Sequence, residues 1–323
     1  MNIRTDLAIE AREMVGKGEV PGVLFEKEGT LSLRISRVKV LNEEGKKAIG
    51  KPIGTYITIE TDGIRNKEQK FIRRICEAIA REINKMLNIS INSTVLVIGL
   101  GNWNVTPDSL GPKVIEKIFV TKHLIEYMPE SYNPEEGIRP VCALSPGVLG
   151  ITGIETGEII MGVVNRVKPS ALIVIDALAS RSLERIGASI QISDTGIHPG
   201  SGVGNKRMGI TKEIIGIPVI AIGVPTVVDA ATIANDTLEK VFNSIEREIK
   251  PGTELFKLVT NLSREEKYEM IKEVLSPYVG ELVVTPKEID SLIEDAALVL
   301  AHGINLALHP GIKYEDLNNL LIH

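Results

Sequence analysis

The chain has 323 residues, with 37 lysines and arginines against 42 aspartates and glutamates, so its formal net charge is −5 at pH 7. This length suits one large α/β domain or two smaller ones, and the acidic balance argues against a general nucleic-acid-binding protein, which would carry a basic surplus. Because aromatic residues make up only 4% of the chain, the core must consist mainly of isoleucine, valine, leucine and alanine.

Segments that would mark another compartment are missing from the sequence. Cys76 and Cys142 show neither metal-ligand spacing nor a disulfide framework. The first residues lack the apolar run of a signal peptide, and the longest apolar stretch, 217–228, is too short and too interrupted by proline and glycine to span a bilayer. We therefore expect a cytoplasmic protein that does not enter a membrane.

The first third of the chain predicts one short helix, a group of strands and one long helix. Residues 5–15 are amphipathic, with Thr5 or Asp6 as the expected helix cap. Residues 20–61 alternate apolar and polar positions, which indicates antiparallel strands with one solvated face. Residues 66–87 carry apolar side chains at helical spacing and predict the clearest helix.

The stretch 94–112, TVLVIGLGNWNVTPDSLGP, predicts a strand, a tight loop and a helix. Thr106 would cap the helix and Pro107 would be its first residue, so Asp108 would lie in the first turn, where free N–H groups favour an anion. Capping alone explains an aspartate in that position. The two glycines of the loop lack the third glycine of the dinucleotide-binding fingerprint.

Alternating elements follow. Helical patterns at 113–127 and 158–167 enclose a short strand at 141–144, and the apolar strand 171–177 ends at Asp176. An ionised carboxylate at the end of such a strand is costly to bury without partners, so Asp176 is either a cap, an ion-pair partner or a functional group.

The last third begins with a glycine-rich loop at 192–210, which contains His198 and could approach a ligand closely or lie free on the surface. Strand 218–223 and helix 225–242 form another unit, with Asp229 as a partner of the helix dipole. Residues 244–280 suggest a peripheral helical addition. A capping box at 285–288 opens a helix that ends near residue 308.

Strands that alternate with helices from residue 94 to 242 indicate an α/β fold with a mainly parallel central sheet flanked by helices. The early antiparallel strands would form an edge of that sheet or a subsidiary sheet. Asp108 and Asp176 each follow an apolar strand. If those strands are neighbours, both carboxylates lie at one edge of the sheet.

Two chemistries fit such a pair. Two carboxyl groups that share a site can titrate apart, so that one activates water while the other, protonated, polarises a carbonyl. Alternatively, the two aspartates and His198 could bind a divalent metal with an open position for water. No serine, cysteine or zinc-helix motif of the common hydrolases is present in the sequence.

Five segments in order give a specific resemblance. They are RTDLAIEA at 4–11, GLGNWNVTPDSLGP at 99–112, SPGVLGITGIET at 145–156, IDALASRS at 175–182 and SDTGIHPGSGVGN at 193–205. Together they resemble the germination protease family of spore-forming bacteria, and the likeness covers essentially the whole chain. The glycine-asparagine loop followed by an acidic residue is also similar, more distantly, to the hydrogenase maturation endopeptidases.

The resemblance implies an endopeptidase that degrades small acid-soluble spore proteins in the forespore and spore core, without a cofactor and without binding nucleic acid itself. The family's two essential aspartates would be Asp108 and Asp176. It also implies a zymogen that assembles as a homotetramer and removes its own short propeptide. The propeptide would be residues 1–6, and 7–323 would form one peptidase domain that includes the addition near 244–280.

The start of the chain fits the substrate pattern that the resemblance implies, which is an acidic residue followed by an apolar residue, alanine, any residue and glutamate. Residues 6–10 have this order, so we predict self-cleavage between Asp6 and Leu7. A helix N-terminus near Asp108 gives a slight preference for Asp108 as the base and Asp176 as the acid.

Two further hypotheses stay open at this point. One is a metal-dependent endopeptidase of the hydrogenase-maturation type, with the same aspartates and His198 as ligands. The other is a non-catalytic nucleotide-binding or scaffold protein that uses its glycine-rich loops for phosphate, against which the incomplete glycine motif counts.

Overall fold

The structure, a computed structural model, describes residues 5–317 except positions 17, 31, 62, 67 and 129 and the segments 131–135, 199–207 and 249–281, in the last of which only Glu266 and Glu273 are described. Nine strands of the described chain form one sheet in the order β1-β2-β3-β7-β8-β6-β4-β5, with β9 paired to β8. The strands are β1 (Val23–Thr30), β2 (Leu33–Val40), β3 (Gly54–Glu60), β4 (Val95–Gly99), β5 (Val141–Leu144), β6 (Ala171–Ser180), β7 (Ser189–Ser193), β8 (Val219–Asp229) and β9 (Val283–Val284).

Strands β5, β4, β6 and β8 are parallel neighbours, whereas β1, β2 and β3 are antiparallel and join them through β7. This confirms the predicted α/β class with a parallel centre flanked by helices. The early strands form an edge of the same sheet, not a separate one.

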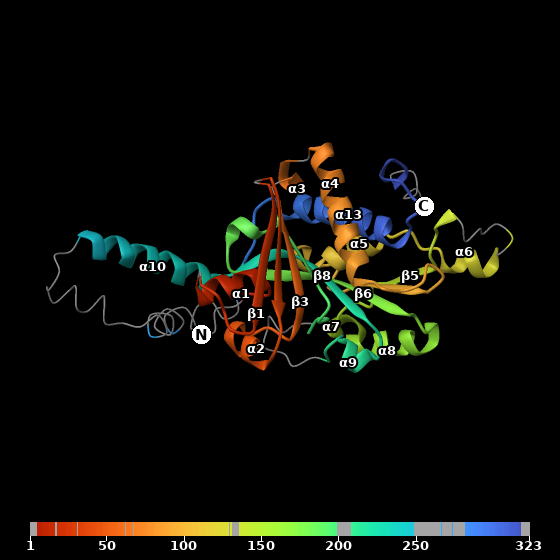
Figure 1. Ribbon diagram of the computed structural model, residues 1–323, viewed down its shortest axis with the longest axis horizontal. Coiled ribbons are helices and arrows are strands. Elements are labelled where there is room, and N and C mark those ends of the chain that lie inside the picture. The colour runs from red at the N-terminus through yellow and green to blue at the C-terminus, as the bar shows by residue number, and fades with distance from the viewer. Residues whose placement is uncertain are drawn as a thin grey trace.

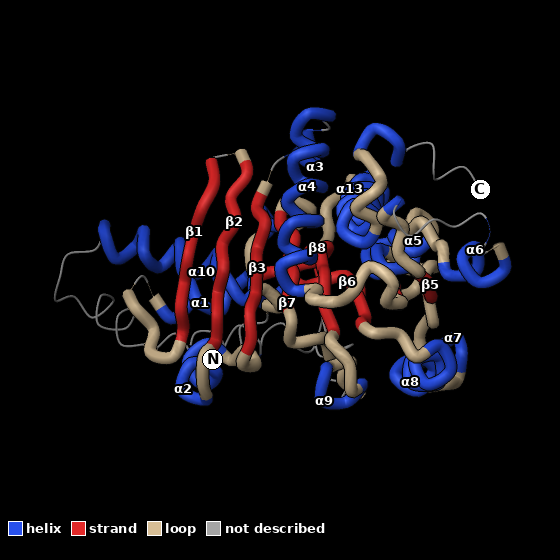
Figure 2. Tube along the Cα trace, turned by 45° about the vertical axis from the view of Figure 1, so that its right-hand side comes forward, coloured by secondary structure: helices blue, strands red, loops and turns tan. Residues whose placement is uncertain are grey.

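Helices cover both faces of the sheet (Figures 1 and 2). α4 (Gln69–Met86), α5 (Leu110–Ile115) and α13 (Ile289–Leu308) lie on one face, and α8 (Thr156–Val167) and α9 (Lys212–Ile215) lie on the other. α1 (Ala8–Val15) and α2 (Glu43–Ile49) pack against β2 and β3. The remaining helices are α3 (Gly63–Asn66), α6 (Lys122–Tyr127), α7 (Leu149–Thr152) and α10 (Ala230–Glu248), with the 3-10 turns η1 (Thr106–Asp108), η4 (Leu183–Arg185) and η6 (Tyr314–Asp316).

Strands at the centre are apolar at consecutive positions because helices cover both of their faces. In β6, Ile173 and Ile175 pack towards α4, α5 and α13, and Leu172 and Val174 pack towards α8. All four side chains are fully buried. The central strands are therefore packed on both faces, and they fix the positions of the loops at their carboxyl ends.

Three predicted boundaries are wrong. The helix expected over 113–127 is two helices, α5 and α6. Strand β6 continues to Ser180, and the helix expected from residue 225 begins only at Ala230, because 224–228 continue β8 beside the extended β6. Pro225 has no N–H to donate to a neighbouring strand. It fits in β8 because the register between β6 and β8 shifts next to it, where regular hydrogen bonding between the two strands is interrupted.

The predicted capping box at 285–288 is also wrong. Thr285 donates its hydroxyl proton to the carbonyl of Thr226 at 2.8 Å, and Glu288, the N-cap of α13, makes no side-chain capping bond. Asp229 does accept from the backbone N–H of Thr232 at 2.9 Å, at the start of α10, as expected of a helix partner. The predicted addition over 244–280 lies almost wholly outside the described residues.

α13 is the one helix of the described chain that is long and apolar enough to cross a membrane, but 67% of its most apolar window is buried inside the fold. It packs against α4 and α5 in the main hydrophobic core. Its apolar character is explained by this packing.

Candidate active site

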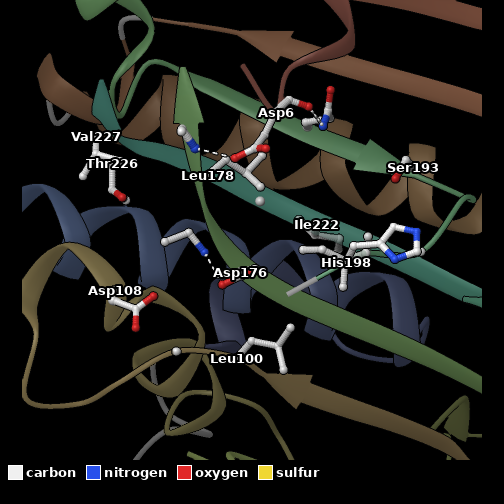
Figure 3. Close-up of a pocket in the computed structure, with 18 of the residues that line it drawn as sticks. Asp6, Leu100, Asp108, Asp176, Leu178, Ser193, His198, Ile222, Thr226 and Val227 are labelled. Carbon is white, nitrogen blue, oxygen red and sulfur yellow. Dashed lines mark hydrogen bonds between the residues drawn. The ribbon is translucent and has the colours of Figure 1, made fainter. Parts of the chain in front are cut away.

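A cavity of about 640 Å³ opens beyond the carboxyl end of β4, and it is bounded by β6, β7, β8, the loop after β4 and Asp6 of the amino-terminal segment. Asp6, Asp108, Asp176 and His198 all line it. Figure 3 shows the side chains of Asp108 and Asp176 directed into the same space, from different elements. The structure thus brings together residues that are up to 192 positions apart in the sequence, from Asp6 to His198.

Asp108 is held by a tight loop. Its N–H donates to the carbonyl of Val105 at 2.8 Å, and its own carbonyl accepts from Asn102 N–H at 3.1 Å. Gly101 passes so close that a Cβ atom there would lie 1.9 Å from the Asp108 carbonyl oxygen, and its φ is +115°. Only glycine fits this close approach with a positive φ.

The expected helical context of Asp108 needs correction. Asp108 ends the three-residue turn η1, and α5 starts after it with Ser109 as its N-cap. The N-cap of η1 is Val105 and that of α5 is Ser109, so Thr106 is the N-cap of neither. Asp108 therefore precedes the helix instead of lying in its first turn, so the helix-dipole argument for Asp108 as the base is weaker than the sequence suggests.

Asp176 lies inside β6, not at its end as expected. β4 pairs with β6 only as far as Gly99 opposite Ile175, so Asp176 is the first residue of β6 beyond the end of β4. On the other side it is in register with Gly223 of β8. One carboxylate oxygen accepts from the N–H of Ala177 at 2.9 Å. Gly223 has no side chain, and Leu178 lies over it, since a Cβ atom at Gly223 would come within 2.5 Å of the Leu178 side chain.

His198 is exposed and its ring lies against Gly209, where a Cβ atom would come within 2.5 Å of the ring nitrogen Nδ1. Across the described parts of the chain, no three histidine, cysteine, aspartate or glutamate side chains gather as metal ligands. Asp108, Asp176 and His198 share the cavity but do not converge on one point as a metal requires. The metal hypothesis is not favoured by this donor set.

The amino-terminal segment borders the cavity through Asp6. Asp6 N–H donates to the carbonyl of Ala179 at 2.9 Å, and Ala179 N–H donates to the Asp6 carboxylate at 2.8 Å. The Leu7 side chain is 0% exposed and packs with Leu178 and Ile197. The predicted caps are wrong, because α1 begins after Leu7 and neither Thr5 nor Asp6 is its N-cap.

The peptide bond between Asp6 and Leu7 is held on both sides. The carbonyl oxygen of Asp6 accepts from Lys51 Nζ at 3.0 Å and from Gln191 Nε2 at 3.0 Å. The Gln191 side-chain oxygen accepts from Ala8 N–H at 2.7 Å, and Leu7 N–H donates to the Thr5 hydroxyl at 3.1 Å. Every main-chain group around this bond therefore has a defined partner.

Lys51 and Gln191 did not stand out in the sequence. Lys51 follows the left-handed Gly50 that ends α2, and nothing in its neighbourhood distinguishes it from a surface lysine. Gln191 lies in SIQIS, where the alternation of β7 indicates a strand with one polar face. That the polar face is buried, with Gln191 directed at the amino-terminal segment, follows only from the pairing of β7 with β3 and β8.

Glu10 is the second anchor of the segment, with 2% of its surface exposed. Its carboxylate accepts from the N–H groups of Arg181 at 2.7 Å and Ser182 at 3.1 Å, and it pairs with Arg185 at 3.2 Å. Burial opposes the charged form of Arg185, but its hydrogen bond with Glu13 and the negative charges of Glu13, Glu10 and Glu60 outweigh this and raise its pKa.

Comparisons with known proteins place the chain. The family model described as germination protease matches residues 4–259 and 252–320. The germination protease of Caldanaerobacter subterraneus subsp. tengcongensis is 55% identical over 99% of this chain and 98% of its own. That of Clostridium tetani is 51% identical over 99% and 100%, and that of Bacillus pumilus is 45% identical over 98% and 96%.

Among solved structures, the crystal structure of the [NiFe] hydrogenase maturation protease HycI from Thermococcus kodakarensis KOD1 is 17% identical and covers 60% of this chain and 99% of its own, with a TM-score of 0.27. A score this low establishes no common fold.

An α/β chain whose full length aligns with peptidases, and whose cavity is lined by aspartates that include Asp108 and Asp176, belongs to the class of proteases. More specifically, the chain belongs to the germination protease family.

Proposed function

We propose that this protein is an endopeptidase of spore germination that starts the degradation of small acid-soluble, DNA-binding spore proteins, and that Asp108 and Asp176 carry its chemistry. The observation that carries the proposal is that both aspartates line one cavity together with Asp6, the residue that precedes the expected cut. The resemblance of the surrounding motifs to the family supports the substrate class and the acidic, apolar, Ala, any, Glu cleavage pattern.

In the proposed reaction, the carboxylate of Asp108 takes a proton from water as the water oxygen forms a bond to the peptide carbonyl carbon, whose π electrons move to the carbonyl oxygen. The protonated Asp176 then gives its proton to the peptide nitrogen while the C–N bond breaks. The products are a carboxylic acid and an amine. The two carboxyl groups titrate as a coupled pair, so this assignment of base and acid is a hypothesis about one microstate.

The same reaction on the protein's own chain would cut between Asp6 and Leu7 and release a propeptide of residues 1–6, which makes the intact chain a zymogen. The hydrogen bond of Asp6 with Ala179 and the burial of Leu7 support this, because they fix the segment beside the cavity that Asp6 lines. The family resemblance further supports a homotetramer in the cytoplasm of the forespore and spore core, acting without a cofactor. Light scattering on the purified protein would then give four times the chain mass of 35.2 kDa.

The test replaces each carboxylate by its uncharged amide. Asp108→Asn and Asp176→Asn should each abolish self-processing, followed as the loss of residues 1–6 by intact-protein mass spectrometry, and cleavage of added spore-protein peptide. Circular dichroism and thermal melting should stay close to wild type. Full activity in either variant would end the proposal.

Asp229→Asn is the matched control. Asp229 also lines the cavity, but its carboxylate caps α10 through Thr232, which an asparagine can do as well. This variant makes the same chemical change in the same cavity and should keep wild-type processing. If it loses activity like the other two, the effect belongs to the charge of the cavity and not to a specific pair.

A further inference from the structure

The peptide bond proposed as the cleavage site carries two hydrogen-bond donors on its carbonyl oxygen, from distant parts of the chain. Lys51 comes from the turn after α2 and Gln191 from the middle of β7, and each places a nitrogen 3.0 Å from the oxygen of Asp6. A carbonyl oxygen has two lone pairs, so this pair of donors saturates it. Within the described residues, the neighbouring carbonyl of Thr5 differs in accepting a side-chain hydrogen bond from Lys51 alone.

The orientation of the Gln191 amide is determined by its two contacts. Its nitrogen faces an acceptor, the Asp6 carbonyl, and its oxygen faces a donor, the Ala8 N–H. In a flipped amide, the Gln191 oxygen would face the Asp6 carbonyl oxygen, and the Gln191 nitrogen would face the Ala8 N–H. Neither contact would be a hydrogen bond. Gln191 therefore spans the residue that follows the bond and fixes the bond's register in the cavity.

Lys51 is the unusual member of the pair. Its ammonium donates to the carbonyls of Thr5 and Asp6 instead of forming a direct ion pair in the described chain. Burial lowers the pKa of Lys51, while the negative charges of Asp6 and Glu10 favour its charged form. A half-buried cation that donates to peptide carbonyls loses part of its hydration. It is also the group needed where negative charge develops on the carbonyl oxygen.

Gln191 is also aligned with Asp176, one of the two proposed catalytic residues. Gln191 of β7 is in register with Gly223 of β8, and Gly223 with Asp176 of β6, so Gln191 and Asp176 project from the same face at the same level of the sheet. Since strands are spaced by about 4.8 Å, their backbones are about 10 Å apart. Over the glycine between them lies the side chain of Leu178, which a Cβ atom at Gly223 would approach to 2.5 Å.

We infer that Lys51 and Gln191 bind the carbonyl oxygen on the amino side of the bond to be cut, and stabilise the negative charge that forms on it when water adds to the carbonyl carbon. This inference rests on the proposed function, since it takes Asp6–Leu7 as a substrate bond. The electron pair that leaves the C=O bond is held on oxygen between the ammonium and the amide, and returns when the C–N bond breaks. The same two side chains serve added substrate proteins.

The experiment uses the full-length chain and two variants that remove one donor each while keeping shape. Lys51→Met keeps the aliphatic stem, and Gln191→Glu keeps the oxygen that accepts from Ala8. Two rates are measured: self-processing by mass spectrometry, and steady-state cleavage of a synthetic peptide that spans residues 3–14 of this chain. We expect kcat to fall on the order of 100-fold or more in each variant, with KM changed only a few-fold. Lys51→Arg should restore part of kcat.

The control Lys47→Met removes an exposed lysine of α2 and should behave as wild type. If Lys51→Met and Gln191→Glu keep wild-type kcat and alter only KM or melting temperature, the two residues merely anchor the segment and the inference is wrong.

The same measurements distinguish failure of the proposed function from failure of the inference about Lys51 and Gln191. If the wild type leaves the peptide intact or cuts it elsewhere, the function proposed above fails. If Asp108→Asn and Asp176→Asn cleave normally while Lys51→Met and Gln191→Glu do not, the carbonyl-binding pair stands and the aspartate assignment falls.

Discussion

At the scale of single residues, the position of the Asp108 carboxylate depends on a backbone contact that only glycine permits. A side chain at Gly101 would collide with the Asp108 carbonyl and would have to adopt φ of +115°. We expect Gly101→Ala to destabilise the fold by roughly 1–3 kcal/mol and to reduce activity further than the loss of folded protein explains, because the loop that carries Asp108 must move.

The matched control for this prediction is Gly162→Ala. Gly162 lies inside α8 with open space around it, so alanine there should stabilise the protein by roughly 0.5–1 kcal/mol and leave activity unchanged. Urea unfolding and peptide cleavage measure both quantities. An active, stable Gly101→Ala protein would show that the loop tolerates displacement and does not position Asp108.

At the scale of elements, a neutral histidine connects the end of α13 to the segments before and after α6. His309 Nδ1 accepts from the N–H of Arg139, and Nε2 lies 3.1 Å from the carbonyl of Phe119, to which it can donate. Burial lowers the pKa of His309 to about 4, while the hydrogen bond to Phe119 opposes this shift. Protonation would place an N–H on Nδ1 against the N–H of Arg139.

This arrangement predicts loss of stability in acid. The folded-state pKa is below the value of about 6.5 in the unfolded chain, so the unfolded state binds the extra proton first. The contribution of neutral His309 to the free energy of unfolding is fully present above about pH 6.5. It falls as the pH drops towards 4, by roughly 3 kcal/mol in total. His309→Asn, whose side-chain oxygen can replace Nδ1 as acceptor, should lose less stability over this range. Equal slopes in both proteins would contradict the role of His309.

At the scale of the whole molecule, the folded chain brings its own proposed cleavage site into its own cavity. Asp6 lies against Ala179 and Gln191 of the same chain. Self-processing should therefore be intramolecular and first-order, with a half-time that does not change when the protein is diluted 100-fold. Time courses followed by mass spectrometry at several concentrations measure this. A half-time that lengthens with dilution would mean that one molecule cuts another.

Local patterns predicted a large part of this molecule. Apolar runs predicted strands β4, β5 and β6, helical spacing predicted α4, and alternation predicted the antiparallel edge. They succeeded because periodicity reports which faces are buried. Boundaries failed where neighbours decide them: β6 and β8 continue past Asp176 and Pro225 because each has the other to pair with, a fact that neither segment contains.

The features of the candidate site also fall into those that the sequence predicts and those that depend on tertiary contacts. The sequence by itself determined the family, the two aspartates proposed for catalysis and the expected cut at Asp6–Leu7, because these depend on residue identity and order. Only the tertiary structure decided that Lys51 and Gln191 contact the carbonyl of Asp6, that Glu10 is anchored by Arg185, and that His198 joins no metal-ligand cluster within the described residues. Those relations arise from the pairing of strands far apart in the chain, and no local pattern encodes them.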